Sequence, residues 1–202
     1  MQWIRSEEKS LQQQAQTPVK LTVETIDNHI YFYSEVDSDR CLALVKSLRE
    51  IDSRLRNEHS SRSLSTQEYP YVPIWLHINS PGGALFTAFG VADQIATLKT
   101  PVLSVVEGYA ASAATILSLS CTKRFILANS FMLIHQLSSG HWGKYEEFKD
   151  EMKLLDMAMR NLTNFYVKRT KINVDMLQDF LKRDSWFNAE QCVELGLVDA
   201  IL

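Results

Sequence analysis

The chain has 202 residues, of which 46% are hydrophobic and 22% are charged, and its formal net charge is −3 at pH 7. A chain of this size can bury one substantial core, which predicts a single domain. The low net charge, without a long run of Lys or Arg, argues against nucleic-acid binding. No segment reaches the roughly 20 apolar residues of a membrane span, and the polar start does not fit a secretory signal. We therefore expect a cytoplasmic or equally reducing location and no membrane partner.

The cysteines are few and widely separated. Cys41, Cys121 and Cys192 form no CxxC pair. Their odd number and spacing fit neither a disulfide framework nor a zinc site. We expect three reduced cysteines with structural roles, and we predict neither a metal nor a cofactor.

The chain begins with a polar segment that contains a cluster of glutamines and lacks apolar periodicity. This composition is typical of a flexible or processed leader, which we place at residues 1–18. One domain is expected to follow over residues 19–202.

The first part of that domain predicts a hairpin and a helix. Apolar and aromatic runs that end at Val23 and begin at Ile30 flank Asp27–Asn28, a pair typical of turns. Residues 39–52 then carry apolar side chains three residues apart, which predicts a helix with one apolar face. The segment 56–67 is rich in Ser, Arg and Glu without periodicity, so we predict a solvated loop inserted at the surface.

From Val72 onward, short apolar runs alternate with helical patterns, which predicts a layered α/β fold. The expected strands cover residues 73–78, 101–106, 124–127 and 131–136, and the expected helices between them cover 84–98 and 112–120. A long helix is predicted over 144–169, because its apolar residues alternate at three- and four-residue spacing. Acidic residues at its start and basic residues at its end complement the helix dipole. A helix of this length can reach another subunit.

A glycine pair marks the first segment with chemical potential. Residues 79–83 read Asn-Ser-Pro-Gly-Gly, directly after a predicted strand and before a predicted helix. Paired glycines allow unusual backbone angles, let a substrate approach closely and can direct an N–H group at an oxyanion. The same residues also fit an ordinary strand-to-helix turn.

A serine among small residues marks the second segment. Ser112 opens a predicted helix and is preceded by Gly-Tyr-Ala-Ala at residues 108–111. Small neighbours leave room for a substrate carbonyl, and the helix start offers free N–H groups and a positive dipole end. The alternative is a helix N-cap, a common role for serine.

A histidine at the end of an apolar strand marks the third segment. His135 lies in the run 131–136 and could act as a general base, although a strand histidine is more often a hydrogen-bonded core residue. The other four histidines, His29, His59, His77 and His141, occupy turn, loop or strand-interior positions. The carboxylate partner stays open, because periodicity does not choose among Asp150, Asp156, Asp175, Asp179, Asp184 and Asp199.

Taken together, these segments resemble the proteolytic subunit of the Clp protease, a serine peptidase family that works with ring-shaped ATP-driven unfoldases. The resemblance covers about residues 73–202. It rests on Asn-Ser-Pro-Gly-Gly, on Gly-Tyr-Ala-Ala-Ser at 108–112 and on Asn-Ser-Phe-Met-Leu-Ile-His-Gln at 129–136. Lys-Arg-Asp at 182–184, Phe-Asn-Ala-Glu at 187–190 and Gly-Leu-Val-Asp at 196–199 complete it.

The resemblance implies specific roles for individual residues. Ser112 would be the nucleophile, His135 the general base and Asp184 the acid that orients the base. The N–H groups of Gly83 and Ala113 would form the oxyanion hole. The substrate would be held by Gly82, Leu137, Ser138 and Ser139.

The resemblance also implies a fold and an assembly. The fold would be the crotonase-like spiral of ββα units, and the segment 136–170 would form a protruding handle. Two seven-membered rings of the same chain would stack into a chamber, with Glu147 and Arg183 forming ion pairs between rings. An ATP-driven unfoldase would supply unfolded polypeptides for cleavage inside that chamber.

Three other functions fit parts of the pattern. The first is a non-catalytic ring subunit that supports active partners, and the second is an acyl-CoA enzyme on the same fold, since a fold does not determine a function. The third is a peptidase that pairs serine with lysine, for which Lys123 is the lysine nearest to Ser112 before His135. An endopeptidase that uses Ser112, His135 and Asp184 remains our main prediction.

Overall fold

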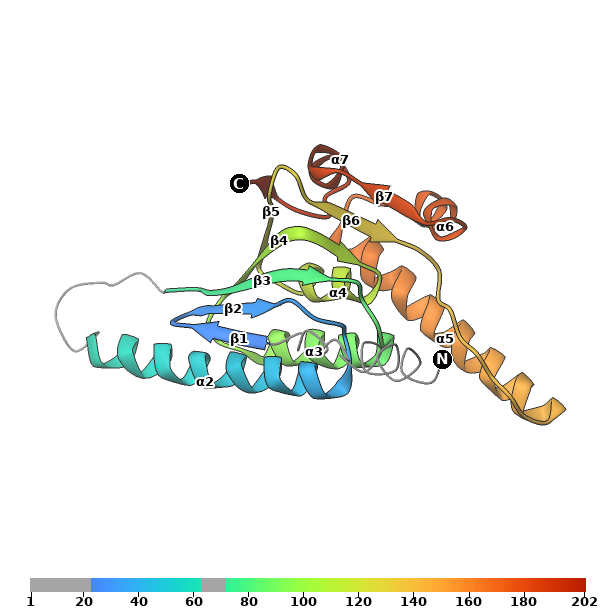
Figure 1. Cartoon of the computed structure of the whole chain (residues 1–202), viewed down its shortest axis with the longest axis horizontal. Coiled ribbons are helices and arrows are strands. Elements are labelled where there is room, and N and C mark those ends of the chain that lie inside the picture. Colours follow the sequence, from blue (N-terminus) through green and yellow to red (C-terminus); the bar gives the residue numbers. More distant parts are fainter. Residues whose placement is uncertain (1–22, 63–71) are drawn as a thin grey trace, which may run out of the picture.

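The computed structural model describes residues 23–62 and 72–202, so the predicted leader lies outside the described residues. Within these ranges the chain forms one eight-stranded sheet and six helices (Figure 1). The strands are β1 (Val23–Ile26), β2 (His29–Phe32), β3 (Ile74–Ser80), β4 (Val102–Ala111), β5 (Lys123–Ile126), β6 (Phe131–Ile134), β7 (Ser185–Phe187) and β8 (Ala200–Ile201). The helices are α2 (Ser38–Arg62), α3 (Leu85–Thr97), α4 (Ala113–Leu119), α5 (Tyr145–Arg169), α6 (Val174–Leu181) and α7 (Ala189–Glu194).

The sheet combines one hairpin with a mainly parallel body. The predicted hairpin is confirmed, since β1 and β2 pair antiparallel and Asp27 adopts a φ of 53° in the turn. Parallel pairing then runs from β2 through β3, β4 and β5 to β8. β4 is the branch point, because residues 103–106 pair with β5 whereas 109–111 pair with β6. The second partner explains why β4 continues five residues beyond the predicted end at 106 and stops at Ala111.

The core lies on one face of this sheet. Alternate residues of β3, namely Ile74, Leu76 and Ile78, are fully buried. The helices α2, α3 and α4 lie along this side (Figure 1). The intervening residues Trp75 and His77 point to the opposite face and stay partly exposed. Mainly parallel sheets are usually covered on both faces, so the partly exposed region around Trp75 and His77, which we call the uncovered face, is a distinctive feature.

The predicted surface loop at 56–67 is wrong over residues 56–62, where α2 continues to Arg62, and residues 63–67 lie outside the described residues. Leu55 extends the buried stripe of the helix past the predicted end at residue 52. Beyond it, ion pairs one turn apart hold a segment that is polar all round: Arg54–Glu58 at 3.3 Å and Arg56–Asp52 at 3.8 Å. Polarity alone therefore misled the prediction.

The long helix α5 confirms the predicted handle helix and projects from the sheet (Figure 1). Only its second half packs on the core, through Ala158, Leu162, Phe165 and Tyr166. The hydroxyl of Tyr166 is hydrogen-bonded to Thr115 Oγ1, which ties α5 to α4. Apolar side chains in the first half are exposed, including Tyr145 at 73%. No helix in the described part of the chain is both long and apolar enough to cross a membrane.

Candidate active site

Ser112 occupies a strained junction between β4 and α4. Its φ is 53°, a left-handed value that is uncommon for a residue with a side chain. Its N–H donates to the carbonyl of Leu133 on β6 at 2.9 Å, and its carbonyl accepts from Thr115 Oγ1 at 2.6 Å. Its side chain makes no capping bond to α4. The N-cap alternative is therefore not supported, and the hydroxyl is left for another purpose.

The glycine pair lies directly against this serine. Gly82 has a φ of 90°, and a Cβ built on it would lie 2.8 Å from Ser112 Cβ and 2.4 Å from the carbonyl oxygen of Ala111. Only a residue without a side chain fits there. Gly83 has a φ of 146°, and its own Cβ would lie 2.4 Å from the carbonyl oxygen of Val36. The segment is thus more than an ordinary turn, because close backbone approach requires both glycines.

Hydrogen bonds to Val36 hold the glycine turn in place. Val36 N–H donates to the Gly82 carbonyl at 2.8 Å, and Ala84 N–H donates to the Val36 carbonyl at 2.7 Å. Neither bond uses the N–H of Gly83. Ala113 is the first residue of α4, where N–H groups have no acceptor within the helix, and its nitrogen lies 3.0 Å from the Cβ position of Gly82.

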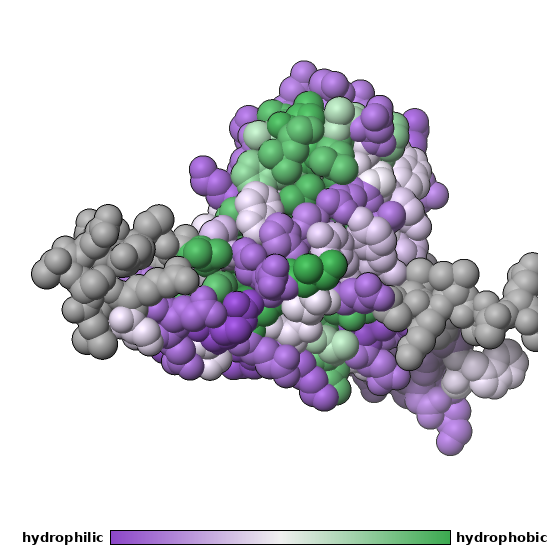
Figure 2. Space-filling view, turned by 60° about the vertical axis from the view of Figure 1, so that its left-hand side comes forward, coloured by the Kyte–Doolittle hydropathy of each residue, from purple (hydrophilic) through white to green (hydrophobic). Residues whose placement is uncertain are grey.

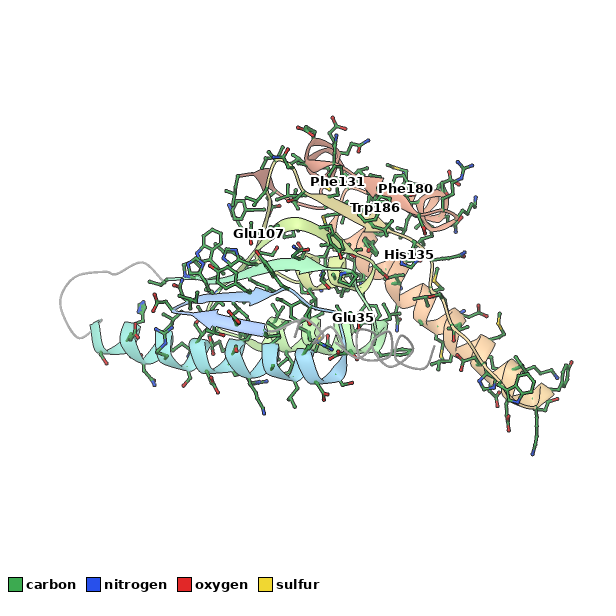
Figure 3. The ribbon with its side chains drawn as sticks, in the orientation of Figure 1. Glu35, Glu107, Phe131, His135, Phe180 and Trp186 are labelled. Atoms are coloured by element: carbon green, nitrogen blue, oxygen red, sulfur yellow. The ribbon has the colours of Figure 1, made fainter. Side chains whose placement is uncertain are left out.

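The strand register brings His135 and Asp184 opposite each other. β6 and β7 pair antiparallel, and their last pair is Ile134 with Ser185. The next residues in this register are His135 and Asp184. Side chains that lie directly opposite in an antiparallel pair have Cβ atoms about 5 Å apart. The Ser112 N–H is bonded to Leu133 on β6, so Ser112 lies beside the end of β6 that His135 follows, and Figure 3 labels His135 at this end.

The side chains of these three residues are not joined by hydrogen bonds. Among the described residues, no hydrogen bond links Ser112 Oγ with His135 or His135 with Asp184. His135 is half-buried and Asp184 is exposed. Several of the alternative aspartates have other partners: Asp150 pairs with Lys153, Asp179 with Lys182 and Asp199 with Arg124. Of the six candidates, only Asp184 lies opposite His135 in this register.

Of the residues expected to hold substrate, Gly82 belongs to the glycine turn and the other three lie between β6 and α5. Leu137 packs against the core, whereas Ser138 and Ser139 are exposed. The hydroxyl of Ser139 donates to Glu151 Oε1 at 3.0 Å. The expected strand 131–136 ends at Ile134, so these residues form no regular strand. Their role in substrate binding stays a prediction.

The two residues expected to join the rings do not meet within one chain. Glu147 accepts from the N–H of Lys144 at 2.7 Å and so closes the first turn of α5. Arg183 is exposed and lies two residues after the end of α6. An ion pair between them would need a second copy of the chain.

Sequence analysis missed a groove beside the candidate site. Its volume is about 680 Å³, and it lies between α5 and α6, next to Gln136. Its lining combines apolar surface with the polar side chains of Asp156, Arg160, Thr163, Asn164, Gln178 and Lys182. The packing angle of the two helices creates this groove, and no local pattern in the sequence encodes that angle.

The cysteines do not compete for the role of nucleophile. Cys41, Cys121 and Cys192 are all buried and unpaired. Burial raises the pKa of the thiols to about 11 for Cys41 and about 12 for the other two. Protonated, enclosed thiols are poor nucleophiles.

The fold and the family follow from comparison with known proteins. The architecture is the ClpP/crotonase fold: the solved structure of a ClpP1 point mutant from Listeria monocytogenes aligns with a TM-score of 0.71 at 23% identity, over 87% of this chain and 91% of that one. Residues 25–202 match the family model described as Clp protease. The chain belongs to this family. The match begins well before residue 73, where the resemblance noted from the sequence starts, so the relationship includes the hairpin and α2.

Sequence relatives support the same family. The chain is 35% identical over 155 residues to the ATP-dependent Clp protease proteolytic subunit 2 of Tropheryma whipplei, covering 75% of this chain and 86% of the relative. It is 35% identical over 137 residues to proteolytic subunit 1 of Protochlamydia amoebophila, covering 66% of each.

Proposed function

We propose that this protein is a serine endopeptidase in which Ser112 attacks the peptide carbonyl, His135 is the base and Asp184 orients it. The observation that supports the proposal best is the convergence described above. Ser112 directly follows β4 and its N–H is bonded to Leu133 on β6, whereas His135 directly follows β6 and Asp184 directly precedes β7, next to the last pair of these two strands, Ile134 with Ser185.

In the proposed reaction His135 removes the proton of Ser112 Oγ as the oxygen attacks the carbonyl carbon. The protonated imidazole then gives that proton to the departing amine, and water releases the acyl group. The N–H groups of Gly83 and Ala113 would stabilise the oxyanion. Hydrogen bonds of this kind are often long in free enzymes and tighten around substrate, so side-chain rotations within the present backbone register can complete the site.

The exposed side chains of α5 support assembly into rings. Phe148 and Met152 are exposed on the projecting half of the helix, and Trp142, in the segment just before it, is 99% exposed. Apolar groups in such an arrangement usually mark an interface. We infer two stacked seven-membered rings joined through α5 and through Glu147 and Arg183. Active sites facing an enclosed chamber, supplied with unfolded chains by an ATP-driven partner, would spare folded proteins in the cytoplasm or a similar compartment.

A non-catalytic ring subunit is the second candidate. The absence of hydrogen bonds among the three side chains in the described structure favours it. In that case the chain would assemble with active relatives but would not react with a serine-directed probe. The acyl-CoA alternative has no comparable support.

Labelling with a fluorophosphonate probe distinguishes these candidates. We expect the purified chain to react with the probe and to cleave fluorogenic peptides, and Ser112→Ala to lose both activities. Ser120→Ala is the matched control, because Ser120 lies at the other end of α4 and donates to Ile116. If Ser112→Ala were labelled as fast as the unmodified chain, the assignment would be wrong. If an assembled, unmodified chain were not labelled at all, the scaffold function would replace it.

A further inference from the structure

Four polar side chains form a hydrogen-bonded network across the uncovered face of the sheet. The hydroxyl of Tyr33 donates to Glu107 Oε2, and Glu107 Oε1 lies 2.7 Å from His77 Nδ1. His77 Nε2 in turn lies 2.8 Å from His29 Nδ1. These residues belong to β2 and its end, β3 and β4, and they lie well away from His135, as the labelled Glu107 in Figure 3 shows. Figure 2 shows one side of the molecule, on which hydrophobic residues gather in a patch near the top of the view and hydrophilic residues surround it.

The geometry of the two histidines shows what lies between them. Their ring centres are 5.1 Å apart and their planes differ by 25°. The distance between the ring centres equals the 2.8 Å between His29 Nδ1 and His77 Nε2 plus the distance from each nitrogen to the centre of its own ring. Both nitrogens therefore lie on the line that joins the two ring centres. A metal ion needs both lone pairs to converge on a point about 2 Å from each nitrogen. The rings instead share a proton.

The order of donors follows from the carboxylate. Glu107 accepts from His77 Nδ1–H, which leaves His77 Nε2 as an acceptor. His29 Nδ1–H must then donate to it. Burial, followed by the hydrogen bond to Glu107, raises the pKa of Tyr33, so the phenol remains the donor at the other end.

The first and the second proton taken up from solvent have different effects on the hydrogen bond between His29 and His77. A first added proton enters at His29 Nε2, and the shared proton can pass to His77, where it lies beside the Glu107 carboxylate. The bond between the rings survives in either form. A second added proton places an N–H on both facing nitrogens. Neither can then accept, so the bond must open.

Groups around His29 have opposing effects on its pKa. Burial lowers the pKa of His29, with His77 as the second cause, whereas Asp27 and Glu107 raise it. In the strand register, His29 lies in a row with Trp75, Leu103 and Lys123, and His77 lies in a row with Tyr31, Glu24, Val105 and Phe125. The charged or titratable groups around the pair are therefore Asp27, Glu107, Tyr33, Tyr31, Glu24 and Lys123.

We propose that the hydrogen-bonded network of Tyr33, Glu107, His77 and His29 is an acid-sensitive latch that fastens the hairpin β1–β2 to β3 and β4. The latch holds through the first proton and opens with the second. Two aromatic rings stack on the histidines of the latch. The ring centres of Tyr31 and His77 are 4.5 Å apart, and those of Trp75 and His29 are 6.0 Å apart. Opening therefore rearranges the aromatic surface of the uncovered face. The latch does not depend on the peptidase activity proposed above.

Hydrogen–deuterium exchange at imidazole C2, read by mass spectrometry on the full chain, tests the latch in an assembly of any size. Between pH 8 and pH 4.5, we expect the hydrogen-bonded pair to take up its two protons in two separate steps, because the first proton leaves the bond between the rings intact and the second opens it. The protection factors of the backbone amides of residues 23–32, which correct for the effect of pH on intrinsic exchange, should fall with the second step. Those of α3 should stay high. Glu107→Gln should move the first step to lower pH. His141→Asn, in the exposed segment before α5, should change neither step.

Two results would overturn the proposal. The first is a single, independent titration step for each histidine, with hairpin exchange that does not follow pH. The second is protection of both rings by stoichiometric zinc at neutral pH, which would make the pair a metal site. Because the deciding measurement uses the unmodified chain, an unstable variant does not affect it.

Discussion

Replacing Gly82 by alanine would place a methyl group in the wall of the proposed active site. The new Cβ would lie 2.4 Å from the Ala111 carbonyl oxygen and 2.8 Å from Ser112 Cβ, so the backbone at Ser112 has to move. A side chain in the left-handed region costs about 1–3 kcal/mol, and overpacking costs a similar amount. We expect unfolding free energy to fall by about 3 kcal/mol, which leaves a domain of ordinary stability folded. The new Cβ would also lie 3.0 Å from the nitrogen of Ala113, so the proposed oxyanion donor has to move. We expect fluorophosphonate labelling to fall by at least about a hundredfold, the usual effect of losing one oxyanion donor.

Gly90→Ala is the matched control for this experiment. Gly90 lies in α3, and nothing lies within 4 Å of the Cβ that alanine would add. Alanine in a helix interior stabilises by roughly 0.5–1 kcal/mol relative to glycine. Urea unfolding and the labelling rate, measured on both variants, separate strain at the site from general effects of alanine. If Gly82→Ala labelled and unfolded like the unmodified chain, the close approach of the turn to Ser112 would be wrong.

Three further predictions concern single side chains. Asp184→Asn should keep the fold and lower kcat for peptide cleavage by at least about a thousandfold, because His135 loses its orienting charge; unchanged kcat would exclude that role. Tyr166→Phe should lower unfolding free energy in urea by about 1 kcal/mol, since Thr115 Oγ1 loses its partner on α5. Burial alone would raise the pKa of Asp52, but the N–H groups of Thr100 and Lys99 and the charge of Arg56 lower it overall. This carboxylate therefore stabilises the fold above about pH 4, and the stabilisation is lost as pH falls through its lowered pKa. Asp52→Asn should flatten that acid dependence in thermal unfolding, and an unchanged profile would contradict it.

The sequence predicted the hairpin, the alternating strands and helices, and α5, because each depends on a local pattern. It did not predict the end of α2, where ion pairs one turn apart maintain a helix without an apolar stripe. Apolar periodicity does not detect ion pairs of this kind.

The candidate site shows the same division between local and distant information. Ser112 and the glycine pair stood out locally, and the positive φ of Ser112 and Gly82 agrees with a strained turn. Asp184 could not be chosen by periodicity, because its position depends on β7, a strand of only three residues that directly follows it. The contacts among His29, His77 and Glu107 come from three strands, whose pairing no local pattern gives. Pairing between distant segments therefore determined what the sequence alone could not.

The structure of the chain after reaction with a fluorophosphonate would test the central claim most directly. We predict a phosphorus–oxygen bond to Ser112, with the phosphoryl oxygen bound by the N–H groups of Gly83 and Ala113. His135 should then lie between the adduct and Asp184, hydrogen-bonded to both. An adduct on another residue, or an imidazole of His135 pointing away from Ser112 while Asp184 is bound elsewhere, would contradict the proposed chemistry.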